Sequence, residues 1–530
     1  LDQLLVEKLL CKGRHQRPGY ARRLLRTLER SGIVPDAVHD PAREGRAYLH
    51  RPDFIGRGRV LQPLVDLLEQ GRGGLVMVGG ESGVGKTRLA QELIREARRA
   101  SVRVWLGYCS NVLGAERRED RPLGLFVPIL RQIADRCLQQ GPAFTAALFR
   151  PEDIAILAPY APYVAQLPMP PGRAVVESLA KLPVDSAQLR LFACLVGVLE
   201  RMCGSSRVLF VLDDLQWGDE LSLGALEFIA KGLEEDSRWL MVGTYRIEEL
   251  ADSALQEMMD ECPCQLIEMG RLDREEVALM VEQMLGHAAD RSLVDIVVAR
   301  SGQNPFFVAE YLRALVDHGV LHQDGQGRWT VVDGPDVGPN PWPEPDSIRT
   351  LLIQRLERLD VESRQVCQAA AVLGRRMATQ TLQTVCPLAH FPFLRALDAL
   401  IQLQILERDG DQLLFVHDKL REVTYTQMDP ELRTAIHRRV AQSLEELESF
   451  DPATTALHWS KGSEPERARA RYIEAARMDA ERWAVGDAKR HLQSALDLIP
   501  EGEAASNKAQ ELWMEWVELS HLKGEHKDAV

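Results

Sequence analysis

The sequence feature that most constrains the fold is Gly-Glu-Ser-Gly-Val-Gly-Lys-Thr at residues 80–87. It fits the pattern G-x-x-x-x-G-K-[ST] at every fixed position. The apolar run 75–79 before it predicts a short buried strand, and residues 88–100 after it predict a helix. Strand, glycine-rich loop and helix in this order are typical of a phosphate-binding loop, so the segment predicts nucleotide binding.

Each fixed position of this loop has a chemical role. Gly80, Gly83 and Gly85 let the backbone curl so that successive N–H groups face one point. The helix that begins near Lys86 adds the positive end of its dipole. We expect Lys86 to reach the β- and γ-phosphates and the Thr87 hydroxyl to hold Mg²⁺, so the expected cofactors are ATP or ADP with Mg²⁺. The alternative is a tight strand-to-helix turn that binds nothing.

Four further apolar runs predict the rest of a sheet, at 103–108, 207–212, 239–244 and 265–269. Helical patterns lie between most of them, which favours a parallel sheet covered by helices on both faces. The expected fold of this part is therefore the α/β P-loop NTPase fold. The stretch 109–185 is too long for a simple crossover and predicts extra helices.

The run 207–212 leads into two carboxylates, Asp213 and Asp214. Mg²⁺ prefers oxygen ligands and keeps several waters, so Asp213 is expected to hold the metal through water. Asp214 is expected to orient or activate the attacking water. The alternative is a strand that simply ends in an acidic turn.

Composition narrows the classes of function. The formal net charge of −14 over 530 residues disfavours a broad nucleic-acid footprint. Nine scattered cysteines do not form the pairs of a metal site, and they favour a reducing, cytoplasmic compartment. No apolar run approaches the ~20 residues of a membrane span. Because the chain starts at Leu1 rather than Met, we expect it to be a piece of a longer protein.

The order of these patterns predicts seven parts. They are an N-terminal helical segment (1–35), a linker (36–49), the P-loop ATPase core (50–271), a helical lid (272–334), a Pro-rich linker (335–346), a winged-helix-like domain (347–430) and a C-terminal helical part that is incomplete (431–530). The winged helix is expected because helices precede an Asp-Gly turn between the apolar runs of 405–416, which predicts a hairpin.

The stretch 211–219, Val-Leu-Asp-Asp-Leu-Gln-Trp-Gly-Asp, resembles the extended Walker B segment of the AAA-like STAND ATPases, the signal-transduction NTPases of bacterial regulators. Further segments resemble boxes of the same family in the same order. They are Phe-Ile-Gly-Arg at 54–57, Gly-Thr-Tyr-Arg at 243–246, Gly-Gln-Asn-Pro-Phe-Phe at 302–307 and Phe-Val-His-Asp at 415–418. The entry box departs from the family pattern, because Gly58 and Arg59 stand where an acidic residue is usual.

This resemblance implies roles for individual residues. Arg246 would face the γ-phosphate as a sensor and take part in catalysis. Pro305 would lie near the adenine, and His417, with the aspartate after it, would contact bound ADP. Arg57 of the entry box and Arg88, directly after the loop, complete the expected nucleotide-binding set. The alternatives are a surface arginine, a proline that only starts a helix, and a packed or solvent-exposed histidine.

The two ends of the chain suggest further domains. Residues 5–18 resemble the last helices of a protein-kinase C-lobe, with Arg17 at its arginine and Arg14 where that pattern has proline. The implied full-length protein is a serine/threonine kinase fused to this ATPase; an ordinary helix pair is the alternative. Small residues between 470 and 500, with Trp483 and Leu492 as large partners, resemble tetratricopeptide repeats, against the alternative of a plain helical bundle.

Three functions compete at this point. The first is a slowly hydrolysing signalling ATPase, closed with ADP and open with ATP, which regulates a larger protein. Its expected partners are proteins at the repeats and further copies of itself on activation, with no membrane. The second is a DNA-binding transcription regulator, which the charge and the acidic hairpin disfavour. The third is a scaffold that binds ATP without hydrolysing it; a mechanical remodelling ATPase is least favoured.

Overall fold

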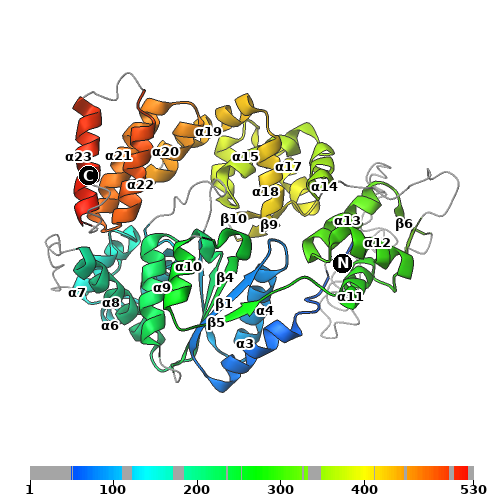
Figure 1. The fold of residues 1–530 in the computed structure, drawn as a ribbon, viewed down its shortest axis with the longest axis horizontal. Coiled ribbons are helices and arrows are strands. Elements are labelled where there is room, and N and C mark those ends of the chain that lie inside the picture. The colour runs from blue at the N-terminus through cyan, green and yellow to red at the C-terminus, as the bar shows by residue number, and fades with distance from the viewer. Residues whose placement is uncertain are drawn as a thin grey trace, which may run out of the picture.

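The computed structural model describes residues 49–50, 52–109, 122–170, 184–233, 237–251, 253–324, 328–331, 348–410, 412–446, 451–500 and 507–522. The kinase-like segment 1–35, the linker 36–48 and the Pro-rich linker 335–346 lie outside these residues. The described residues form a sheet-containing core, a lid, a winged-helix-like unit and a helical C-terminal part (Figure 1). The limits drawn between these parts remain predictions.

The core is a five-stranded sheet in the order β2-β3-β4-β1-β5, and every neighbouring pair of strands is parallel. The strands are β1 (Gly74–Gly80), β2 (Arg103–Tyr108), β3 (Val208–Asp213), β4 (Trp239–Arg246) and β5 (Cys264–Glu268). All five expected strands are present within a residue or two, which confirms the α/β fold with a parallel sheet.

Two apolar layers cover the sheet because alternate residues of a strand point to opposite faces. Val76 and Val78 of β1 pack with Leu89 and Leu93 of α4 (Lys86–Arg99). Leu75 and Met77 of the same strand face a second core. The helices α3 (Gly58–Gln70), α9 (Glu220–Gly232) and α10 (Ala254–Glu261) and the short turn η4 (Leu215–Trp217) complete the layers. A second short turn, η5 (Ile247–Glu249), follows β4 and has no buried residue.

A helical insertion separates β2 from β3, as the length of that stretch predicts. It contains α5 (Val127–Gln140), α6 (Pro142–Leu148), α7 (Pro151–Leu157), η3 (Pro162–Gln166) and α8 (Val184–Cys203). Its buried side chains belong to the same apolar core as Leu75 and Met77 of β1. The insertion is therefore packed against one face of the sheet.

The lid contains α11 (Arg274–Leu285), α12 (Arg291–Ser301) and α13 (Pro305–Asp317). The sequence predicted a lid made of helices alone, but the structure also contains strands there. An antiparallel pair of short strands, β6 (Leu321–Gln323) and β7 (Trp329–Val331), follows α13. Trp329 is buried in the lid core, so the hairpin folds back and closes that core.

The winged-helix-like unit contains α14 (Ile348–Glu357), α15 (Val361–Leu373), β8 (Arg376–Ala378), α16 (Thr379–Val385), α17 (His390–Gln402), β9 (Leu406–Asp409), β10 (Gln412–Phe415) and α18 (Asp418–Gln427). Its strands form an antiparallel sheet in the order β8-β10-β9. The hairpin expected in 405–416 is thus confirmed. In Figure 1 this unit, yellow-green to yellow, lies above the core sheet.

The C-terminal part is helical: α19 (Pro430–Glu445), α20 (Pro452–Lys461), α21 (Pro465–Glu481), α22 (Val485–Asp497) and α23 (Asn507–Leu522). Small residues such as Ala475 and Ala488 are buried between neighbouring helices, and Leu492 packs among them, as expected. Trp483 does not pack among these buried residues; it is half-buried and lies in the turn between α21 and α22. A φ of 58° lets Trp483 make that turn, and its carbonyl faces the core insertion.

Within the described residues, no helix is both long and apolar enough to cross a membrane.

Candidate nucleotide site

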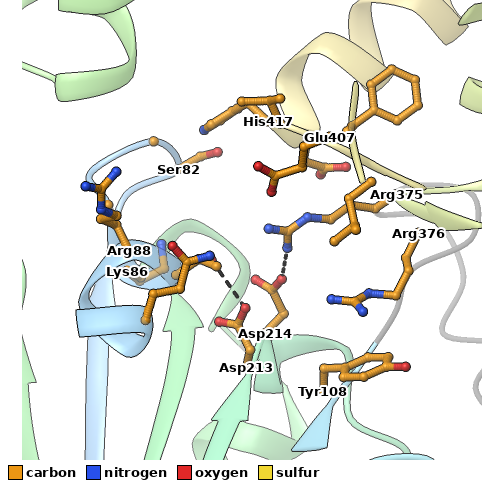
Figure 2. A pocket seen from close by; sticks show the side chains of 18 of the residues that line it. Ser82, Lys86, Arg88, Tyr108, Asp213, Asp214, Arg375, Arg376, Glu407 and His417 are labelled. Atoms are coloured by element: carbon orange, nitrogen blue, oxygen red, sulfur yellow. Dashed lines mark hydrogen bonds and ion pairs between the residues drawn. The ribbon is translucent and has the colours of Figure 1, made fainter. Parts of the chain in front are cut away.

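The core and the winged-helix-like unit enclose one cavity of 480 Å³ at the ends of the central strands. The core contributes residues of the glycine loop together with Asp213, Asp214 and Arg246. The winged-helix-like unit contributes Arg375, Arg376 and residues of 407–418, and Figure 2 shows Arg375 and His417 projecting toward the loop and the two aspartates. A ligand in this cavity would touch both units.

Two glycines give the loop a shape that no other residue would adopt without strain. Gly83 has a φ of 88° and Gly85 a φ of 103°, both in the left-handed region. A Cβ on Gly83 would lie 2.8 Å from Asn304 Oδ1 and 3.3 Å from His417 Nε2. The loop is therefore packed closely against both the lid and the winged-helix-like unit.

Lys86 is buried, and its ammonium group donates to the carbonyls of Gly80 at 2.7 Å and Glu81 at 2.9 Å. Burial, and then the nearby Arg246, lower the pKa of Lys86 to about 8. An anion beside Lys86 would favour its charged form. The phosphates of a nucleotide are anions of this kind, and Lys86 is also the first residue of α4, where the positive end of the helix dipole lies.

The two residues expected to hold Mg²⁺ lie together. The Thr87 hydroxyl donates to Asp213 Oδ2 at 3.2 Å, and the Thr244 hydroxyl donates to Asp213 Oδ1 at 2.5 Å. Burial, and then the adjacent Asp214, raise the pKa of Asp213. A hydroxyl next to a carboxylate fits Mg²⁺, whose charge would stabilise the ionised form of that acid.

Asp214 occupies a strained position beside this pair. Its φ of 59° is unusual for a residue with a side chain, and its backbone N–H donates to Thr244 Oγ1 at 3.1 Å. Its Oδ1 accepts from Gln216 Nε2 at 3.1 Å, and its Oδ2 pairs with the guanidinium of Arg375. The strained turn orients this carboxylate toward the cavity, where the expected water-activating role would place it.

Arg246 lines the cavity, but in this state it is paired with protein carboxylates. Its Nη2 donates to Asp418 Oδ2 at 2.9 Å and its Nη1 donates to Glu249 at 3.0 Å. The guanidinium lies 4.6 Å from the centre of the Trp217 ring. Although burial lowers the pKa of Arg246, Asp418 and Asp214 raise it further, so its charge is permanent. Arg246 thus connects the core with the winged-helix-like unit.

His417 belongs to the winged-helix-like unit and lies next to Gly83 of the glycine loop. Its Nδ1 accepts the N–H of Lys419 at 3.1 Å, which caps α18, and its ring stacks on Phe306 of the lid at 3.6 Å. Burial lowers the pKa of His417 to about 3, so the ring is neutral at pH 7. Because Nδ1 accepts a hydrogen bond, the neutral ring carries its proton on Nε2 and can donate that N–H to a ligand.

The lid box at 302–307 reaches the loop through residues other than the expected one. Asn304 Nδ2 donates to the Ser82 carbonyl at 3.0 Å, and the Phe306 N–H approaches the Gly83 carbonyl at 3.4 Å. Pro305 starts α13 at its first turn and is absent from the cavity wall. Asn304 also caps α13, so one residue fixes both the helix start and the loop.

The two remaining arginines differ in their positions. Arg88 lines the cavity edge and bonds to Glu92 and to the Pro52 carbonyl. Arg57 is buried behind the loop, where its Nη2 donates to the Val84 carbonyl at 3.1 Å, and it is not part of the cavity wall. Arg57 therefore supports the loop from outside, whereas the nucleotide contact expected for Arg88 remains a prediction.

Sequence reasoning missed Arg375, which follows Gly374 at the end of α15. No motif marks this position, since the contact with Asp214 spans 161 residues. It also missed Glu248, whose carboxylate accepts the Ser82 N–H at 2.8 Å. An arginine directly after a helix-ending glycine is the one local signal for Arg375.

Comparison with known proteins agrees with this geometry. Residues 53–242 match the family model of the AAA ATPase domain. The matched region contains the loop at 80–87 and both aspartates. A protein of Rhizobium meliloti (strain 1021) described as uncharacterized is 24% identical over 444 residues, which cover 81% of this chain and 40% of that protein. The chain thus spans less than half the length of this relative.

Two solved structures are also similar. One is a Signal Transduction ATPase with Numerous Domains (STAND) protein with a tetratricopeptide repeat sensor from Pyrococcus horikoshii. It has 12% identity and a TM-score of 0.47, and the match covers 90% of this chain and 66% of that one. The other is the Aeropyrum pernix ORC1 protein in complex with DNA. It has 13% identity and a TM-score of 0.31, and the match covers 74% of this chain and 94% of that one.

Proposed function

We propose that this chain is an ATPase switch that binds ATP with Mg²⁺, hydrolyses it slowly and changes the contact between its AAA ATPase domain and its winged-helix-like unit. The observation that carries the proposal is the shared cavity: groups for phosphate, metal and water lie in the core, and groups of the winged-helix-like unit line the same space. A nucleotide there would stabilise one arrangement of the two units over the other.

The residues divide the chemistry among them. The loop N–H groups and Lys86 would hold the phosphates, while Thr87 and Asp213 would hold Mg²⁺. When bound, Mg²⁺ supplies charge neutralisation at the transferred phosphoryl group. Asp214 would orient the attacking water, and Arg246 would stabilise charge on the γ-phosphate after release from Asp418. ADP, which lacks that phosphate, would leave the Arg246–Asp418 pair closed.

The first experiment is to purify the chain without added nucleotide, denature it and identify what is released by chromatography. Near-stoichiometric ADP supports a switch that rests in a closed state. ATP hydrolysis by the empty protein at a high rate would favour a constitutive ATPase instead.

In Lys86→Ala, loss of the main phosphate contact should reduce ATP affinity about 100-fold, equivalent to about 3 kcal/mol. Unchanged affinity would refute the site.

The wider role follows as part of the same proposal. The C-terminal helices would bind a protein partner, as stacked helical repeats do, and self-association would follow activation in the cytoplasm. The regulated protein would be a serine/threonine kinase, since 5–18 resembles the end of a kinase domain. Kinase assays on a full-length protein, with wild-type chain and Lys86→Ala, test this link: equal kinase activity in both would contradict it.

A further inference from the structure

Arg375 places a cation of the winged-helix-like unit directly on the carboxylate expected to activate water. It lies between α15 and β8 and extends across the cavity to Asp214 Oδ2, as Figure 2 shows. Although burial lowers the pKa of Arg375, Asp214 and then Asp213 raise it, so the guanidinium stays charged. The contact joins two units that are far apart in sequence.

In this arrangement both oxygens of Asp214 are engaged. Gln216 Nε2 donates to Oδ1 at 3.1 Å and Arg375 Nη1 donates to Oδ2, while Asp214 itself is only 5% exposed. A carboxylate that activates water needs a lone pair directed at that water, and Arg375 takes up one on Oδ2.

A second pair crosses the same boundary with the charges reversed. Arg246 of the core donates to Asp418 of the winged-helix-like unit at 2.9 Å. The core thus contributes one anion and one cation, and the winged-helix-like unit contributes the opposite charge to each. Since both pairs connect the same two units, a movement that separates the units breaks both. Asp214 then keeps only Gln216 and Arg246 keeps only Glu249 among these partners.

The winged-helix-like unit is attached differently to the lid. Glu310 of α13 is buried and receives Arg313 and Arg355, and Arg355 also donates to the Leu403 carbonyl. The hydrogen bonds of Arg375 are less complete: within the described part of the chain, its buried Nε has no hydrogen-bond partner. An unpaired buried N–H is unfavourable, so we expect the contact with the core to be the one that opens.

We propose that Arg375 is an inhibitory residue that holds Asp214 inactive while the winged-helix-like unit is closed on the core. This inference rests on the proposed ATPase function and specifies how that site is regulated. Opening of the unit removes Arg375 and restores Asp214 as the group that orients water. The proposal therefore predicts that loss of Arg375 increases hydrolysis rather than decreasing it.

The test compares the whole chain with Arg375→Met, Arg375→Lys and Arg395→Met. Methionine keeps most of the apolar stem without the charge. Arg395 is a matched control, because it belongs to the same unit and pairs with Glu362 on the exposed surface. The measurements are the affinity for a fluorescent ATP analogue and kcat and KM for ATP hydrolysis.

We expect Arg375→Met to raise kcat about tenfold with KM within about twofold. Arg375→Lys should fall between it and the wild type, because an ammonium neutralises Asp214 without the guanidinium geometry. Arg395→Met should match the wild type. Should the methionine variant not fold, Arg375→Gln carries the same expectation. An unchanged or reduced kcat in folded Arg375→Met overturns the inhibitory role, and a reduced value would mean that Arg375 assists catalysis.

These measurements separate the inhibitory role of Arg375 from the proposed ATPase function. If the wild type binds and hydrolyses ATP but the Arg375 variants behave like it, only the inhibitory role is wrong. If the wild type binds no nucleotide, the proposed function is wrong and this inference falls with it.

Discussion

Arg246 at the end of β4 and Asp418 at the start of α18 are both buried and lie 2.9 Å apart, although 172 residues separate them. We expect Asp418→Asn to weaken the closed arrangement, because it removes the buried negative charge that holds Arg246 to the winged-helix-like unit and leaves Glu249 of the core as the closest carboxylate to Arg246. ADP release, followed with a fluorescent analogue, should accelerate about tenfold or more. The control is Glu362→Gln, which removes an exposed pair in the same unit. An unaltered release rate in Asp418→Asn would show that this pair does not hold the nucleotide state.

Gly83→Ala tests the shape of the loop. The substitution strains a left-handed residue and puts a methyl group 2.8 Å from Asn304 Oδ1, so the loop must move away from the lid. We expect a loss of about 1–3 kcal/mol in nucleotide binding or stability. Gly58→Ala, at a helix start with nothing within 4 Å of the new methyl group, should leave both unchanged. Calorimetric titration with ATP distinguishes the two, and equal behaviour would refute the packing argument.

Substitution of the two adjacent carboxylates should affect different steps of ATP hydrolysis. Asp213→Asn removes the charged partner of Thr87, so hydrolysis should require roughly tenfold more Mg²⁺ or more. Asp214→Asn should leave ATP binding within about threefold and reduce turnover about 100-fold or more, since the amide is not a base. Titration of Mg²⁺ at saturating ATP measures the first effect and single-turnover hydrolysis the second. Normal hydrolysis by Asp214→Asn would contradict the role given to it.

Two buried histidines predict loss of stability in mild acid. His437 and His458 are almost completely buried with their Nδ1 atoms 2.9 Å apart. Burial lowers the pKa of His437 to about 2 and that of His458 to about 3, so both are neutral when folded. Below pH ~6.5 the unfolded chain binds protons that the folded chain does not. Stability present above pH 6.5 is therefore lost as the pH falls toward 3.

The expected slope is about 1.4 kcal/mol per pH unit for each histidine. Thermal unfolding of the chain between pH 7.5 and 5 measures it. His458→Gln should reduce the slope by the share of one histidine, because the buried His437 and His417 remain. His322→Gln, at an exposed position, should leave the slope unchanged. A melting temperature that does not change below pH 6 would contradict the neutral state of the buried pair.

The C-terminal helices touch the core at the α21–α22 turn. The Tyr160 hydroxyl donates to the Arg482 carbonyl at 2.5 Å, and Gln188 Nε2 donates to the Trp483 carbonyl at 2.9 Å. Tyr160→Phe removes this hydrogen bond and should weaken the contact between the turn and the core by about 1 kcal/mol. Hydrogen exchange at the turn should then be about fivefold faster. Tyr163→Phe is the control, since that hydroxyl bonds to the Val127 carbonyl within the insertion itself. Equal protection in both variants would show that the contact does not hold the turn.

The core could be predicted from sequence because its signals are local. The glycine loop, the apolar strands and the two aspartates follow one another within short segments, and their spacing fixes a strand, a turn and a helix. Helical patterns also predicted the helices of the lid, and the Asp-Gly turn between two apolar runs predicted the hairpin at 405–416. It missed the strands β6 and β7, because three-residue runs are too short to show alternation.

What the sequence alone determined is the chemistry available at the phosphate and metal positions, because a loop of eight residues and the end of one strand carry it. What only the tertiary structure decided is which groups meet there. Arg375 reaches Asp214 across 161 residues, and Arg246 pairs with Asp418 rather than remaining free for a phosphate. Such pairs depend on how one unit packs on another, and no local pattern records the distance between two charges on separate units.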